Sequence, residues 1–162
     1  MKDVYNKNNP ADYEECLEIK NLSADDVTIH GYASVFDILD SHNDIVLKGA
    51  FKETIKRFES GKIIPILWQH MQDKPIGVVD SIEEDEYGLY ISARILKGIR
   101  YGREAIELIK SHIICEFSIG YNVINHKIDH DTDTRIINKI DLWEISVVTF
   151  PANSETLITA IS

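Results

Sequence analysis

The chain has 162 residues, of which 44% are hydrophobic, and this suits one domain with a core of ordinary size. Seventeen basic residues against 27 acidic ones give a net charge of −10, which argues against nucleic-acid binding because that needs clustered Lys and Arg. No apolar run approaches the ~18 residues that cross a bilayer, so no membrane contact is expected. With two cysteines and no CxxC pair, the sequence predicts a soluble intracellular protein.

The apolar pattern predicts more strands than helices. We expect strands at 16–20, 27–36, 63–70, 75–82 and 89–96, and two long strands around a polar turn within 115–149. Apolar residues at helical spacing predict helices at 50–59 and 101–114. The expected fold is α+β, a mainly antiparallel β-barrel flanked by helices. Residues 1–14 lack apolar periodicity and are expected to be a flexible lead-in to a single domain at 15–162.

Three strand-like segments each carry a side chain that serine hydrolysis uses. They contain His70, Ser118 and Glu144. Serine is a poor nucleophile unless a base takes its proton, and the base works best when a third group orients it. We therefore consider Ser118 as nucleophile, His70 as general base and then acid, and Glu144 as the group that orients His70. Taken singly, each of these residue types on a strand is more often structural or solvated than catalytic.

The last two strands allow a register to be predicted. A hairpin that pivots near Asp131 sets Ser118 opposite Glu144, and Glu116 opposite Ser146. Directly opposed residues share a sheet face, so serine and carboxylate would lie on one side. The other side would be the core face, with Phe117, Ile119, Trp143 and Ile145. The same reasoning does not place His70. The glycine-bearing stretch 97–103, before a helix, is a candidate source of N–H donors for an oxyanion.

Two other chemistries fit some of the same residues. A metal hypothesis rests on the ligand types near the polar turn: His126, Asp129, His130, Asp131 and Asp133. Turn chemistry alone explains such a composition, so we expect no metal and no cofactor. Glu116 and Glu144 could form the paired carboxylates of a glycosidase, but the chain lacks the aromatic excess expected of a sugar-stacking groove.

Four runs in order resemble the bacteriophage prohead protease family. Gly31–Asp37, with Asn43–Val46 and Gly49–Phe51 after it, resembles the opening of that family. Leu67–His70, with Pro75–Gly77 after it, resembles the histidine motif of the family. Phe117–Tyr121 resembles its serine motif, and Trp143–Asn153 resembles its closing motif. The likeness runs from Ile29 to Asn153. Three loop positions depart from the common pattern, namely Asn43, Lys48 and Met71.

The resemblance implies a capsid-maturation serine protease with a fold like the herpesvirus assemblins. By the motif match, His70 and Ser118 are the base and nucleophile, and Glu144 is the third member. The implied substrates are the major capsid protein and scaffold, cut in the host cytoplasm inside assembling proheads, with no nucleic acid or membrane involved. A homo-oligomer and a trimmed protease domain are left open. We expect an extended substrate segment laid along a strand edge or groove.

One rival within the same fold is a non-enzymatic capsid-assembly or scaffold protein. A degenerate copy of that kind would be expected to lose His70 or Ser118, and both are present. The other rival is the metal-dependent or glycosidic hydrolase that uses the acidic residues.

Overall fold

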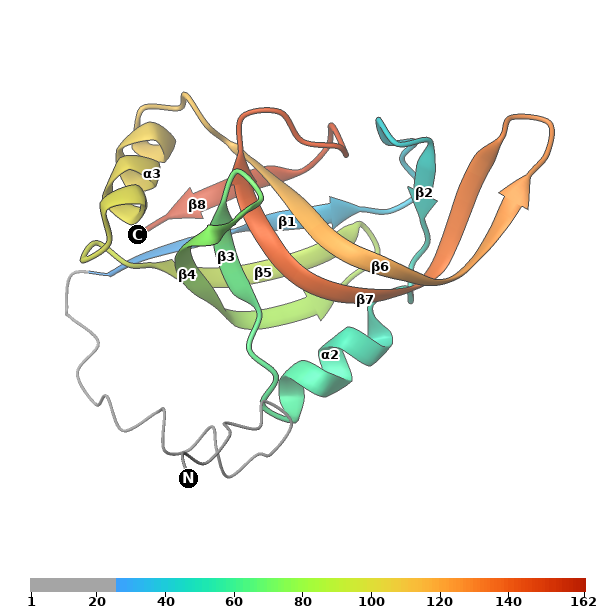
Figure 1. The fold of residues 1–162 in the computed structure, drawn as a ribbon, viewed down its shortest axis with the longest axis horizontal. Coiled ribbons are helices and arrows are strands. Elements are labelled where there is room, and N and C mark those ends of the chain that lie inside the picture. The colour runs from blue at the N-terminus through green and yellow to red at the C-terminus, as the bar shows by residue number, and fades with distance from the viewer. Residues whose placement is uncertain (1–25) are drawn as a thin grey trace, which may run out of the picture.

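A computed structural model describes residues 26–162, which form an eight-stranded sheet curled around one core, with two helices outside it (Figure 1). The strands are β1 (Val27–Val35), β2 (Asp44–Val46), β3 (Pro65–Trp68), β4 (Met71–Glu84), β5 (Gly88–Ile95), β6 (Glu116–Asp129), β7 (Thr134–Val148) and β8 (Leu157–Ile161). The helices are α2 (Lys52–Glu59) and α3 (Arg100–Lys110). This half-barrel confirms the predicted fold class. The strand expected at 16–20 lies outside the described residues.

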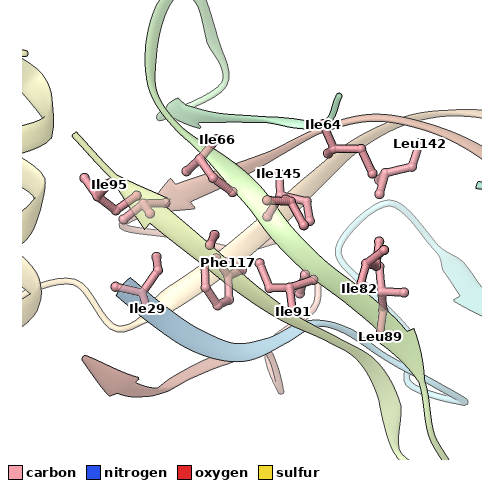
Figure 2. Packing of buried hydrophobic residues seen from close by; sticks show 14 of the residues in the cluster. Ile29, Ile64, Ile66, Ile82, Leu89, Ile91, Ile95, Phe117, Leu142 and Ile145 are labelled. Atoms are coloured by element: carbon pink, nitrogen blue, oxygen red, sulfur yellow. The ribbon is translucent and has the colours of Figure 1, made fainter. Parts of the chain in front are cut away.

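The core is built from the apolar faces that the sequence pattern predicts. Along β5, buried and half-buried residues alternate, which is the period of a strand with one face in the core. Phe117 of β6 and Ile145 of β7 pack among isoleucines from the facing strands (Figure 2). Helix α3 buries Ala105, Ile106 and Ile109, which recur at helical spacing. Neither helix described within 26–162 is long and apolar enough to span a bilayer.

Strand β7 has neighbours on both sides, and this arrangement positions the site. The sheet order is β2-β7-β3-β4-β5-β1-β8, and β6 pairs with β7 off that path. Near its C-terminal end, β7 pairs with β3 in parallel and with β6 in antiparallel orientation, so Ser146 has Leu67 and Ser118 as its two partners. Two segments far apart in the sequence are therefore held within one strand spacing of β7.

A two-residue turn joins β3 to β4, shorter than the sequence predicts. Trp68 pairs with Met71, and Gln69 and His70 between them have φ of 53° and 58°. Two consecutive left-handed residues define the type I′ hairpin turn, whose twist matches the flanking strands. The strands expected at 63–70 and 75–82 leave a four-residue loop at 71–74, and this expectation is wrong because those residues begin β4. The turn sets His70 at the tip of the hairpin, directly beside β7.

Candidate active site

The β6–β7 hairpin brings serine and carboxylate together in a register that differs from the predicted one. Ser118 lies opposite Ser146, Gly120 opposite Glu144, and Glu116 opposite Val148. The expectation that Ser118 faces Glu144 and that Glu116 faces Ser146 is therefore wrong by two residues. The turn is centred slightly beyond Asp131, and bulges along the strands add the remaining offset. A two-residue offset preserves the alternation, so Ser118 and Glu144 still share one face of the sheet.

One bulge also explains where the predicted core face fails. Glu144 pairs with Gly120 and Leu142 pairs with Tyr121, so Trp143 between them has no partner on β6. The alternation changes phase at this point, and Leu142 is buried while Trp143 is 48% exposed. Trp143 was expected in the core, and that expectation is wrong. Phe117 and Ile145 are fully buried as predicted.

His70 and Glu144 form the central contact of the site. Nδ1 of His70 lies 2.6 Å from Oε1 of Glu144, and the glutamate side chain is only 12% exposed against 43% for the histidine. A carboxylate accepts hydrogen bonds, so this contact favours the tautomer with the proton on Nδ1. The other ring nitrogen, Nε2, is left available to accept a proton from a further group.

Both residues of the turn, Gln69 and His70, form hydrogen bonds to β7. The His70 backbone N–H donates to Oγ of Ser146 at 3.0 Å. The Gln69 N–H donates to the Val147 carbonyl at 3.1 Å, and its side chain exchanges two hydrogen bonds with Thr149. These bonds extend the β3–β7 pairing beyond the end of β3, so the histidine projects from a fixed backbone.

Two residues that the sequence reasoning gave no role hold the Glu144 carboxylate. Ser146 is fully buried, and its hydroxyl donates to Oε2 of Glu144 at 2.7 Å. A Cβ at Gly120 would lie 2.4 Å from Oε1 of Glu144, so the missing side chain provides the space that the carboxylate occupies. The sequence did carry a signal for Ser146, because it lies two residues after Glu144 and residues two apart on a strand share a face. Gly120 carried no comparable signal, because the contact depends on the true register.

His70 and Ser118 line a common cavity of about 750 Å³. Other walls come from Gly120–Val123 of β6, from Ala33 and Ser34 of β1, and from the loop before β8. None of the described residues 97–103 lines this cavity. The oxyanion donors expected from that stretch are therefore not found at this site.

A half-buried ion pair also lines the cavity. Arg135 donates to both carboxylate oxygens of Asp44, at 2.6 and 2.5 Å, and Asp44 is 1% exposed. The Tyr121 hydroxyl donates to the same carboxylate at 3.1 Å. Burial, together with the negative charge and hydrogen bond of Asp44, raises the pKa of Tyr121 well above its ordinary value. The tyrosine is therefore a neutral hydrogen-bond donor at physiological pH.

The geometry does not favour the two alternative chemistries. Glu116 and Glu144 lie at pairing positions four residues apart along the hairpin, which separates their backbones by about 13 Å. Glu144 is also bonded to Nδ1 of His70, whereas glycosidases use two carboxyl groups that both face the sugar. Among the described residues 26–162, no three His, Cys, Asp or Glu side chains gather so that they could hold a metal ion.

The comparisons with known proteins agree on one family. Residues 15–162 match the family described as Caudovirus prohead serine protease. The chain belongs to this family. The prohead protease of Enterobacteria phage HK97 is 34% identical over 156 residues, covering 88% of this chain and 68% of that protein. The prohead protease of Escherichia phage T5 is 29% identical over 161 residues, covering 88% and 75%.

A capsid polyprotein of Pseudomonas phage PAJU2 is also similar, at 32% identity over 154 residues, which is 90% of this chain and 21% of the polyprotein. Two solved structures share the fold. The KSHV protease, in complex with a hexapeptide phosphonate inhibitor, matches with a TM-score of 0.53 at 10% identity, covering 85% of this chain and 65% of that one. The capsid assembly protease of bacteriophage T4 has a TM-score of 0.53 at 12% identity, covering 74% and 80%. The family resemblance and the assemblin-like fold inferred from the sequence are confirmed.

Proposed function

We propose that this prohead protease is a serine endopeptidase that cleaves capsid proteins during capsid maturation. The observation that carries the mechanism is the 2.6 Å contact between His70 Nδ1 and Glu144 Oε1, at the edge of a cavity that Ser118 also lines. A histidine held by a buried carboxylate presents Nε2 as a base, and a nearby serine is the group that such a base activates. The proposed roles are Ser118 as nucleophile, His70 as base and then acid, and Glu144 as the orienting group.

The proposed reaction follows from these positions. Oγ of Ser118 bonds to the carbonyl carbon of the scissile peptide while its proton passes to Nε2 of His70. Glu144 balances the positive charge of the imidazolium. When the carbon–nitrogen bond breaks, the same proton passes from Nε2 to the leaving amine, and an acyl-enzyme remains. Water then attacks the acyl carbon, its proton passes through His70, and Ser118 is released.

We propose that the substrate binds as an extended segment beside β6. Within the described sheet, β6 pairs with β7 alone, and Gly120–Val123 of β6 line the cavity next to Ser118. An unpaired strand edge offers backbone N–H and C=O groups to an added strand, which recognises a peptide backbone in any sequence. A substrate complex with the peptide bound as a helix would contradict this mode.

The relatives support the substrate class and the location. Two are prohead proteases, and a third similar segment lies within a phage capsid polyprotein. We propose the major capsid protein and scaffold as substrates, and the assembling prohead in the host cytoplasm as the place of action. The division into a lead-in at 1–14 and a protease domain at 15–162 stays a prediction, which limited proteolysis of the purified protein would test.

Co-expression with the cognate capsid protein tests the mechanism. We expect Ser118→Ala and His70→Ala to reduce processing by more than ~10³-fold, and Glu144→Gln by about 10²–10⁴-fold, because an amide cannot balance the imidazolium. Ser92→Ala, on β5 away from the cavity, is the matched control and should process normally. Equal processing by wild type, Ser118→Ala and His70→Ala would refute the serine mechanism and favour the non-enzymatic assembly protein.

A further inference from the structure

Ser146 is the buried hydroxyl at the junction of the three strands that carry the site. It lies on β7, fully buried, between Ser118 on β6 and Leu67 on β3. Buried hydroxyl groups in a protein interior need hydrogen-bond partners, and the choice of partners shows what the group does. The Ser146 hydroxyl donates one hydrogen bond and accepts another, and both partners belong to the proposed catalytic residues His70 and Glu144.

The two hydrogen bonds of Ser146 belong to a ring of bonds that begins and ends at His70. The hydroxyl donates to Oε2 of Glu144 at 2.7 Å and accepts from the backbone N–H of His70 at 3.0 Å. The other carboxylate oxygen, Oε1, meets Nδ1 of His70 at 2.6 Å. The ring of bonds thus begins at the His70 backbone, passes through Ser146 and Glu144, and ends at the His70 imidazole.

We propose that Ser146 is a positioning residue for the proteolytic reaction, one that fixes the angle of the His70 imidazole by anchoring both Glu144 and the backbone of the turn. This inference rests on the proposed roles of His70, Glu144 and Ser118. One hydroxyl can donate to a carboxylate and accept from an N–H at the same time, which neither a methyl group nor a free backbone could do. Without it, Oε2 and the His70 N–H each lose a partner, and the carboxylate can rotate away from Nδ1.

The consequence is specific to the chemical step. Ser146 has no exposed surface and does not line the cavity, so it has no contact with a bound peptide. Its loss should therefore reduce the rate of attack by Ser118 and leave substrate binding unchanged. A displacement of about 1 Å in a catalytic group can cost roughly 10²-fold in rate.

A fluorophosphonate probe measures this step without knowledge of the cleavage sequence. The probe bonds to Oγ of Ser118 with loss of fluoride, and the dependence of labelling rate on probe concentration separates kinact from KI. For the full-length protein, we expect Ser146→Ala to lower kinact by about 10- to 100-fold with KI unchanged. Ser146→Cys keeps the shape of the side chain but replaces the hydroxyl with a larger thiol, which is a poor hydrogen-bond donor, and it should lower kinact by a similar factor. Ser92→Ala and Ser92→Cys are the matched controls and should label as wild type does.

The His70 Nδ1 proton gives a second readout that a purely structural role would not move. A proton held between imidazole and carboxylate resonates far downfield, and its loss in His70→Ala assigns it. We expect the resonance to weaken or vanish in Ser146→Cys while it persists in Ser92→Cys. This spectrum also decides the case if Ser146→Ala does not fold.

The outcomes separate this inference from the function on which it rests. Wild-type kinact and an unchanged downfield proton in Ser146→Cys, with no labelling of Ser118→Ala, would overturn the role of Ser146 alone. Labelling of Ser118→Ala at the wild-type rate would instead overturn the serine mechanism.

Discussion

The two ends of the β6–β7 hairpin have the same strands but different surroundings. At the base, 116–120 pairs with 144–148, and β3 covers the other side of β7. In the arm, 122–129 pairs with 134–141, and β2 takes the place of β3. The base is mostly buried, whereas Ile124 and Ile128 of the arm are 54% and 48% exposed. The arm extends away from the half-barrel, in orange at the right of Figure 1.

The base of the hairpin positions the candidate active-site residues, whereas the arm contributes to the attachment of the hairpin to β2. The base holds its side chains by close fit, with the Glu144 carboxylate in the space left by Gly120. The arm is held to the rest of the molecule by the parallel β2–β7 pairing and by the ion pair between Asp44 of β2 and Arg135 of β7. A small change of shape at the base should therefore disturb chemistry first. A change of charge in the arm should disturb stability first.

Gly120→Ala tests the close fit of the base and should have the largest effect. The new Cβ would lie 2.4 Å from Oε1 of Glu144, so the carboxylate must move away from His70. We expect fluorophosphonate labelling of Ser118 to slow by about 10²-fold. The unfolding free energy should also fall, by about 1–3 kcal/mol, since the new Cβ would lie 2.9 Å from Cδ and Cγ of the buried Glu144 side chain as well. Gly98→Ala is the control, because a Cβ there meets no atom of residues 26–162 within 4 Å. A wild-type labelling rate in Gly120→Ala would contradict the close-fit account.

Asp44→Asn tests the ionic attachment of the arm. Asp44 is 1% exposed and is bonded by Arg135 and Tyr121, so the change removes the charge that pairs with a guanidinium. We expect the unfolding free energy to fall by about 2 kcal/mol, less than for a fully buried pair because Arg135 can recover water. Urea unfolding followed by circular dichroism measures this. Asp131→Asn, in the exposed turn, should change the unfolding free energy by less than ~0.5 kcal/mol. Equal effects of the two changes would remove the contrast between base and arm.

The pH dependence of stability should show the smallest effect, where α2 meets β7. Burial raises the pKa of Asp141, but the Lys62 hydrogen bond and the charges of Lys62 and Arg57 outweigh it, so the pKa lies below 3.8. A folded-state pKa below the unfolded one gives stability that is present above pH 4 and is lost as pH falls through the folded value. Asp141→Asn should therefore have a flatter stability curve below pH 4 in acid titrations of unfolding. Parallel curves for the two proteins would contradict this.

The elements that depend on local pattern were predictable from the sequence. The ends of β5, α2 and α3 lie within one to four residues of the expected ranges, because one buried face fixes the apolar pattern of each element. The polar turn between β6 and β7 was also predicted at the position where the structure has it. Strand β8 was missed, since its half-exposed residues carry weak alternation.

The site itself depended on features that local pattern does not carry. Bulges are set by packing around the strand pair, so the two-residue offset at Ser118 had no sequence signal. The turn at Gln69 and His70 lacks the Asn or Gly usual for left-handed residues, and it is held instead by bonds to β7 and to Thr149 just after it. The meeting of His70 and Glu144 follows from the parallel β3–β7 pairing, which only the folded chain specifies.

That parallel pairing also sets the order in which the protein gains its site during synthesis. His70 leaves the ribosome 74 residues before Glu144, and their contact closes a loop of that length. Contacts so distant in sequence form late, because the chain loses loop entropy before the pairing stabilises it. A nascent chain that ends anywhere before β7 holds a histidine with no carboxylate beside it. Under the proposed mechanism, proteolytic competence therefore begins only when the last long strand has been made.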